Sequence, residues 1–225
     1  MPQRSRFSCV CFDCDSTLTR VEGIDELARL RGCEAEIAPL TRQAMDGSLT
    51  LEEVYARRLE RVRPDREALR WLGDSYVENI VQGARETIDV LRQGGAIIHI
   101  VSGGLRQPVL ALASALGIEP ACVHAVEVYL DDSGAYRGFD AASPLTRSDG
   151  KAVVCRHLAA RYGSVALVGD GVSDLAARDG GAFIVGFGGV IAREKVAECA
   201  DYFVATPTLT ATLAALLASD GRGGG

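Results

Sequence analysis

The sequence FDCDSTLT at residues 12–19 follows an apolar run at residues 7–12 and carries two carboxylates, Asp13 and Asp15, directly behind that run. The apolar run has the length of a buried strand and is too short for a typical helix. In an open α/β sheet, ligands collect beyond the carboxyl ends of the strands. A carboxylate there can attack phosphorus, and a second one nearby can protonate the leaving oxygen. The alternative is a polar turn in which Asp15 or Ser16 caps the next helix.

Composition limits the class of protein. The chain has 225 residues, 48% of them hydrophobic, and a formal net charge of −6. This length suits one large domain, or a core domain with a small insertion. The acidic balance argues against nucleic acid or an anionic membrane as a partner. No apolar run approaches the roughly 18 residues that span a bilayer, and the start of the chain leads into a strand instead of a signal segment. We therefore expect a cytoplasmic monomer or homodimer that acts on a small molecule.

The seven cysteines offer a second possible chemistry. Cys11 and Cys14 form a CxxC pair, which could indicate a redox or zinc site. No second pair follows, and this one straddles the end of the predicted strand. We expect buried, reduced thiols, because reduced cysteine packs as a small hydrophobe.

A long helical segment follows the first strand. Residues 22–31 carry an apolar stripe at helical spacing, and helical patterning continues to about residue 79 with breaks at Gly32, Pro39, residues 46–47 and Pro64. A crossover between neighbouring strands needs far fewer residues. The segment 20–79 is therefore predicted to be an inserted helical cap.

From residue 80 onward, helices and strands alternate, as in α/β folds. Residues 105–116 and 208–218 are predicted helices, and residues 123–130 and 135–139 read as a hairpin. The predicted core strands after the first one are residues 96–101, 165–168, 183–185 and 202–204. We predict a Rossmann-like, doubly wound, mostly parallel sheet, with residues 1–19 and 80–225 as the core domain and residues 20–79 as a small helical cap.

Four polar stretches are predicted at the ends of core strands or at the starts of the helices that follow. They are Asp13 with Asp15, Ser102 with Gly103, Lys151, and Asp170 with Asp174. Carboxylates that converge on one crevice repel one another unless a cation lies among them. An oxygen-rich site with few protein ligands suits Mg²⁺, which also binds phosphate oxygens. Taken singly, Asp170 could be a helix cap, and Lys151 an exposed lysine.

The turn at Ser102 and Gly103 offers a hydroxyl and backbone amides to phosphate oxygens, although such turns are also common for structural reasons. Lys151 is predicted at a helix start, where the helix dipole disfavours a cation. It would therefore need an anionic partner, either an aspartate or a substrate.

The ordered set DxDxT at residues 13–17, Ser102, Lys151 and GDGxxD at residues 169–174 resembles the haloacid dehalogenase-like phosphatases. The local sequence at residues 15–28, at 102–104 and at 186–189 is similar to the phosphoserine phosphatases within that family. The resemblance covers nearly the whole chain. It implies Mg²⁺-dependent hydrolysis of O-phospho-L-serine to L-serine and phosphate through an aspartyl-phosphate.

The resemblance also implies a role for each matching position in the core. Asp13 would be the nucleophile, and Asp15 would protonate the leaving oxygen and then activate water. Mg²⁺ would be held by Asp13, the backbone carbonyl of Asp15 and Asp170, with Asp174 in support.

The substrate contacts follow from the same resemblance. Ser102, Gly103 and Lys151 would hold phosphate oxygens, and Ser173 would lie near the phosphate. These contacts would offset the charge that grows during phosphoryl transfer.

In the cap, the resemblance assigns Glu22 to the substrate ammonium, Arg58 to the carboxylate and Met45 to the substrate stem. Without it, Glu22 is a helix-start acid and Arg58 a base on a solvated helix face.

Three positions depart from the family pattern: Asp46 stands where glycine is expected, Leu51 replaces an aromatic residue and Val190 replaces an asparagine. Arg193 keeps the base expected further on. The departures leave a second hypothesis open, in which the same core acts on another small phosphate ester or passes the phosphoryl group to an acceptor other than water. A third reading, a phosphate-dependent binding module without catalysis, is disfavoured because Asp13, Asp15, Lys151 and Asp170 are all retained.

Overall fold

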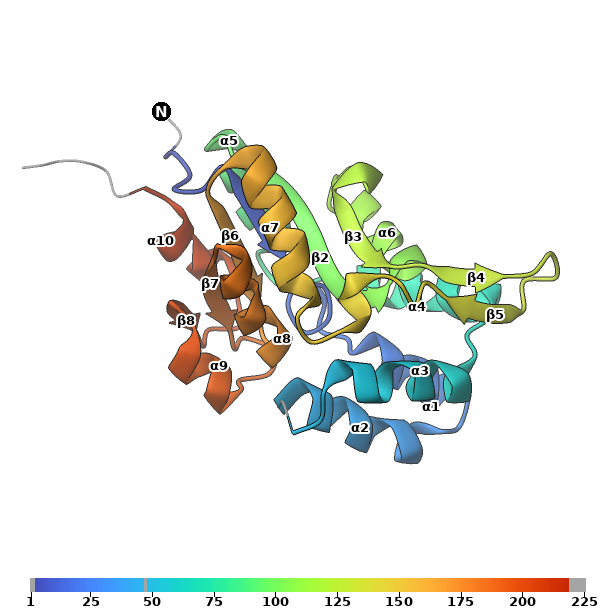
Figure 1. Cartoon of the computed structure of the whole chain (residues 1–225). Helices are drawn as coiled ribbons and strands as arrows, with labels where there is room; N and C mark the ends of the chain where they lie inside the picture. The colour runs from blue at the N-terminus through green and yellow to red at the C-terminus, as the bar shows by residue number, and fades with distance from the viewer. Residues whose placement is uncertain (1–2, 47, 219–225) are drawn as a thin grey trace, which may run out of the picture.

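A parallel sheet forms the centre of the computed structural model, which describes residues 3–46 and 48–218, with only the backbone for residues 45 and 46 (Figure 1). In this part of the chain the sheet has six strands in the order β3-β2-β1-β6-β7-β8, and every neighbouring pair is parallel. The strands are β1 (Cys9–Phe12), β2 (Ile97–Leu105), β3 (Val123–Val126), β6 (Val165–Gly169), β7 (Ala182–Phe187) and β8 (Tyr202–Val204). The predicted Rossmann-like α/β fold is confirmed.

Strand β1 lies in the middle of this sheet because its residues are apolar on both faces. All four residues of Cys9–Phe12 are fully buried, and the strand pairs with β2 on one side and β6 on the other. Continuous apolar runs are typical of parallel strands that are covered on both faces. Asp13 follows at the carboxyl end of β1, and its backbone N–H donates to the carbonyl of Val168 at 2.9 Å.

Helices cover both faces of the sheet, as a doubly wound topology requires when its crossovers are right-handed. Helix α5 leads into β2, and α6 connects β2 to β3, on one flank of β1 within the sheet. Helix α7 leads into β6 on the other flank and packs on β6 and β7. Figure 1 shows α7 in front of the sheet. The helices of the core are α5 (Ala84–Gln93), α6 (Arg106–Ala115), α7 (Gly150–Tyr162), α8 (Val172–Leu175), α9 (Glu194–Cys199) and α10 (Leu213–Leu216).

Two parts of the core differ from the sequence predictions. Strand β2 does not close at residue 101 but continues through Leu105, because the chain stays extended and pairs again with β3 at Val126 after an irregularity. The predicted hairpin at residues 123–130 and 135–139 is only partly correct. Residues Val123–Val126 join the main sheet as β3, and the hairpin consists of β4 (Val128–Leu130) and β5 (Tyr136–Phe139) alone.

The segment after β1 is helical, as predicted, and consists of α1 (Gly23–Leu30), α2 (Glu34–Asp46), α3 (Leu51–Val62) and α4 (Arg66–Glu78). The predicted break at Pro39 is wrong: α2 runs through this exposed proline, which removes one backbone donor without ending the helix. Thr19 and Ile80 form an isolated antiparallel bridge, so the chain leaves and re-enters the core at one point. This bridge agrees with the proposed cap boundaries, which stay a prediction.

The four helices of this segment differ in where they lie relative to the sheet. In Figure 1, α1, α2 and α3 lie together beyond one end of the sheet, whereas α4 runs back toward α6. A Cβ atom on Gly73 of α4 would lie 2.9 Å from the Cβ of Ala111 of α6, so glycine allows this close approach. No helix in residues 3–46 and 48–218 is long and apolar enough to cross a membrane.

Candidate active site

Asp13 and Lys151 form the centre of the candidate site. The Lys151 Nζ lies 2.8 Å from Oδ1 of Asp13 and 2.5 Å from Oδ1 of Asp174, and all three side chains are at least 93% buried. The two carboxylates raise the pKa of Lys151, although its burial alone would lower it. The lysine predicted at a helix start therefore has aspartate partners, which explains why a cation is tolerated there.

The predicted acidic cluster is present. Asp13, Asp170 and Asp174 each offer a carboxylate oxygen, and these oxygens lie within 4.8 Å of one another. Burial, together with neighbouring carboxylates, raises the pKa of Asp170 well above its usual value. Such crowding in a buried place indicates a site built for a cation, because charged groups of one sign destabilise one another there.

Local backbone geometry brings the third carboxylate of this cluster into place. Asp174 accepts a hydrogen bond from the Gly171 amide at 2.8 Å, in the first turn of α8. A Cβ atom on Gly169 would lie 2.2 Å from the Asp174 Cγ, so only glycine fits at the end of β6. The GDGxxD sequence therefore has a steric reason in the structure.

Asp15 lies beside Gly23 at the start of α1. The Gly23 amide donates to its Oδ2 at 3.3 Å, whereas its Oδ1 is buried without a partner in the described residues. Burial raises the pKa of the Asp15 carboxyl to about 7, and the charge of Asp13 contributes, although Tyr76 acts in the opposite direction. A carboxyl with this pKa can give and take a proton near neutral pH.

Glu22 and Arg193 lie next to this carboxylate group. The Ser16 hydroxyl donates to Oε1 of Glu22 at 2.7 Å, and an Arg193 nitrogen lies 3.5 Å from the same oxygen. Arg193 also pairs with Oδ2 of Asp170 at 3.1 Å. Burial raises the pKa of Glu22 to about 8, and an incoming cation would favour its ionised form.

The glycine-rich turn forms another wall of the site. The Ser102 hydroxyl accepts a hydrogen bond from the Gly104 amide at 3.0 Å, and the Gly103 carbonyl accepts one from the Tyr55 hydroxyl at 2.9 Å. Tyr55 belongs to α3, so this bond joins the helical segment to the core. Tyr55 was not among the predicted site residues, although it lies three residues before Arg58 and hence on the same helix face.

Arg58 is 7% exposed and lies above the ring of Tyr55, with its Cζ 5.9 Å from the ring centroid. Its interpretation as a base on a solvated helix face is wrong, because the side chain points inward. Its NH1 donates to the Thr41 hydroxyl at 3.3 Å, and its Nε is buried without a partner in the described residues. The Met45 and Asp46 side chains lie outside the described residues.

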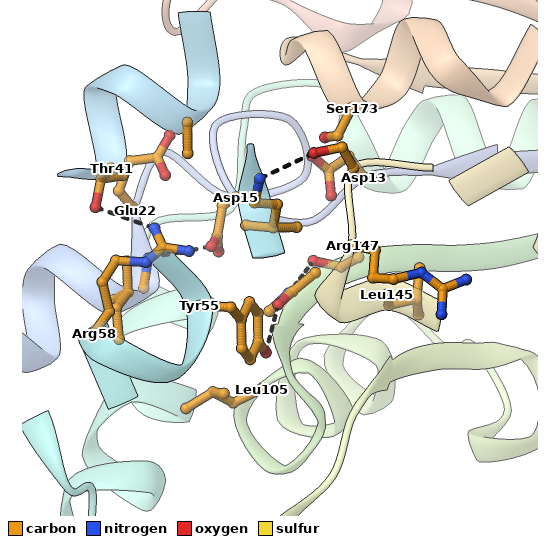
Figure 2. Close-up of a pocket in the computed structure, with 18 of the residues that line it drawn as sticks. Asp13, Asp15, Glu22, Thr41, Tyr55, Arg58, Leu105, Leu145, Arg147 and Ser173 are labelled. Carbon is orange, nitrogen blue, oxygen red and sulfur yellow. Dashed lines mark hydrogen bonds between the residues drawn. The ribbon is translucent and has the colours of Figure 1, made fainter. Parts of the chain in front are cut away.

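One cavity of about 300 Å³ connects these groups. Figure 2 shows Asp13 and Ser173 on its right, Arg58 and Thr41 on its left, and Asp15 between them. Leu51 also lines the cavity, while Val190 is half-buried and packs on the core. Asp170 and Asp174 do not line the cavity; Asp174 pairs with Lys151, which does, and Asp170 pairs with Arg193. The predicted site residues that line it are Asp13, Asp15, Glu22, Arg58, Ser102, Gly103, Lys151 and Ser173.

Comparisons with known proteins agree with this geometry. A family model described as haloacid dehalogenase-like hydrolase matches residues 10–178. The phosphoserine phosphatase of Mus musculus is 34% identical over 197 residues, which cover 87% of this chain and 88% of that protein. Two solved structures are each 26% identical, over 93% of this chain and 98% of theirs. They are a substrate-bound phosphoserine phosphatase complex, with a TM-score of 0.79, and a phospho-aspartyl intermediate analogue of phosphoserine phosphatase, with a TM-score of 0.77. The sequence, the fold and the buried carboxylate site together mean that this chain belongs to the haloacid dehalogenase-like hydrolase family.

Proposed function

We propose that this chain is a Mg²⁺-dependent phosphatase that hydrolyses O-phospho-L-serine to L-serine and phosphate through a phosphorylated Asp13. The observation that carries the proposal is the content of one cavity: Asp13 with Lys151 at one side, and at the other the buried Arg58, whose Nε has no hydrogen-bond partner among the described residues. The relatives that carry the name phosphoserine phosphatase support the choice of substrate.

The surroundings of Asp13 support its role as nucleophile. Its Oδ1 accepts hydrogen bonds from Lys151 and from the Cys14 amide, each at 2.8 Å. Asp13 also lines the cavity, so we propose its Oδ2 as the oxygen that attacks phosphorus. In the first step the bond from Oδ2 to phosphorus forms and the bond from phosphorus to the serine oxygen breaks.

Asp15 would give its proton to the departing serine oxygen. In the second step it would take a proton from water as the water oxygen attacks phosphorus, which frees phosphate and restores the Asp13 carboxylate. Its pKa of about 7 and its unpartnered Oδ1 support both roles.

The described residues fit a magnesium ion, because the carboxylates of the site outnumber Lys151 and Arg193, the two cations that pair with them. Asp13, the backbone carbonyl of Asp15 and Asp170 would hold the ion, with Asp174 in support. When bound, the ion would supply positive charge against the phosphate oxygens. Lys151, the Ser102 hydroxyl, the Gly103 amide and Ser173 would complete the phosphate contacts.

The carboxylate and the ammonium group of the substrate would be bound by residues of the cap. Arg58 would pair with the substrate carboxylate, as a guanidinium fork suits a carboxylate. Glu22 would pair with the ammonium group, and Met45 would pack on the substrate stem. A selective site for phosphoserine needs this base and acid, because the substrate carries a carboxylate and an amine besides its phosphate.

The test compares Glu22→Ala and Arg58→Ala with the unmodified chain, using O-phospho-L-serine and O-phosphoethanolamine, which lacks the carboxylate. Arg58→Ala should lower kcat/KM for phosphoserine about a hundredfold and change that for phosphoethanolamine little. Glu22→Ala should impair both substrates, since both carry an amine. Arg61→Ala, on the same helix but exposed, is the control for a lost α3 arginine. Unchanged phosphoserine turnover in both cavity variants would reject the substrate and favour another small phosphate ester.

We also propose a cytoplasmic location. All seven cysteines are free, which is usual in a reducing compartment, and five of them are buried.

A further inference from the structure

A chain of hydrogen bonds lies behind Arg58 and connects three helices of the cap. The Arg58 NH1 on α3 donates to the Thr41 hydroxyl on α2 at 3.3 Å, and that hydroxyl donates to Oδ1 of Asp25 on α1 at 2.7 Å. Thr41 is 4% exposed and lines the cavity. Figure 2 shows the Thr41 side of this arrangement next to Arg58.

Burying Arg58 has a cost that the structure must offset. The side chain is 7% exposed, and burial lowers its pKa. Its NH1 bonds to the neutral Thr41 hydroxyl instead of a carboxylate, and its Nε has no hydrogen-bond partner among the described residues. A buried charge is tolerated only with nearby compensation. The negative charges of Asp25, Glu22 and Asp15 all favour the charged form of Arg58. Of these, Asp25 is connected to Arg58 through the Thr41 hydroxyl, which lies between them.

The inserted hydroxyl has a consequence for binding. A direct ion pair with Asp25 would occupy the guanidinium fork and would have to break before a ligand carboxylate could bind. With Thr41 between them, Asp25 supplies charge and fixes one nitrogen of Arg58, while the remaining donors stay available. The Tyr55 ring supports the other side of the guanidinium, and the Tyr55 hydroxyl is itself bonded to Gly103.

We propose that Thr41 is a positioning residue for carboxylate recognition: its hydroxyl, held by Asp25, keeps Arg58 aimed into the cavity without neutralising it. This inference rests on the proposed function, because it assigns to Arg58 the carboxylate of the substrate. It adds that affinity for that carboxylate depends on a hydroxyl that does not touch the substrate.

The test uses Thr41→Val, which keeps the shape of the side chain but removes the hydroxyl. Its KM for O-phospho-L-serine should rise about tenfold, with kcat within about twofold of the unmodified chain, as expected for a lost hydrogen bond to a charged group. Competitive inhibition by inorganic phosphate should stay unchanged, because phosphate binds on the Asp13 side of the cavity. Thr41→Ser, which restores the hydroxyl, should return KM to near its original value.

Asp25→Asn provides a second variant if Thr41→Val unfolds. It removes the charge but leaves the Thr41 hydroxyl in place, so KM for phosphoserine should rise while phosphate inhibition is kept. The inference is overturned if KM is unchanged, if inhibition by phosphate weakens equally, or if Thr41→Ser behaves like Thr41→Val. A failure of the proposed function can be distinguished from these outcomes, because Arg58→Ala would then turn over phosphoserine normally.

Discussion

Asp13 depends on contacts from three parts of the chain. Lys151 approaches from α7, the Cys14 amide from the next residue, and Asp174 shares the lysine from α8. Replacing the carboxylate by an amide keeps the shape but removes the nucleophile. We predict that Asp13→Asn lowers kcat about a thousandfold or more.

The measurement for Asp13→Asn is phosphate release together with mass spectrometry of acid-quenched protein. The unmodified chain should carry one phosphoryl group on the peptide that contains Asp13, and the variant should carry none. Asp89→Asn, an exposed change on α5, should keep both activity and adduct. A variant with normal activity would exclude Asp13 as the nucleophile.

At the level of elements, two histidines connect β2 and β3 outside the active site. Nδ1 of His99 and Nε2 of His124 lie 3.0 Å apart, so one ring donates and the other accepts. Burial, with His124 nearby, lowers the pKa of His99 to about 4. The folded state therefore favours neutral His99. This contribution to stability is complete above pH 6.5, the usual value for the unfolded chain, and is lost as the pH falls toward 4.

We predict that protonation of this pair lowers the free energy of unfolding by up to about 3 kcal/mol as the pH falls. Urea unfolding at pH 7 and pH 5 should show a fall in the free energy of unfolding that shrinks in His124→Gln. The exposed His157 of α7 is the matched control, and His157→Gln should keep the full pH dependence. Equal pH dependence in all three proteins would show that the pair does not titrate in this range.

Some elements could be predicted from the sequence and others could not. Strand β1 was predictable, since a buried apolar run has few physical explanations. Lys151 was assigned to the site only together with the other motifs, because taken singly it could be an exposed lysine. The continuation of α2 through Pro39 was not predictable, because an exposed proline removes one backbone hydrogen-bond donor without ending the helix. The contacts of Thr41 with Arg58 and Asp25 join separate helices, and no spacing within one helix reveals them.

At the scale of the whole molecule, a cation bound at the carboxylate cluster of Asp13, Asp170 and Asp174 should add stability to the folded state alone. We predict that saturating Mg²⁺ raises the free energy of unfolding, by about 2.7 kcal/mol at a hundred times its dissociation constant. Thermal unfolding with Mg²⁺ or a chelator measures the shift. Asp170→Asn should remove most of it, whereas Asp89→Asn should keep it. The same shift in Asp170→Asn would place the ion elsewhere.

Phosphoserine hydrolysis is tested by measuring steady-state phosphate release by the unmodified chain with Mg²⁺. It compares kcat/KM for O-phospho-L-serine with the values for phosphothreonine, a sugar phosphate and an aromatic phosphate ester. We predict a preference for phosphoserine of about a hundredfold or more, which corresponds to about 2.7 kcal/mol of differential transition-state binding. Equal and slow turnover of all four esters would contradict phosphoserine as the substrate, while leaving a phosphatase of another specificity.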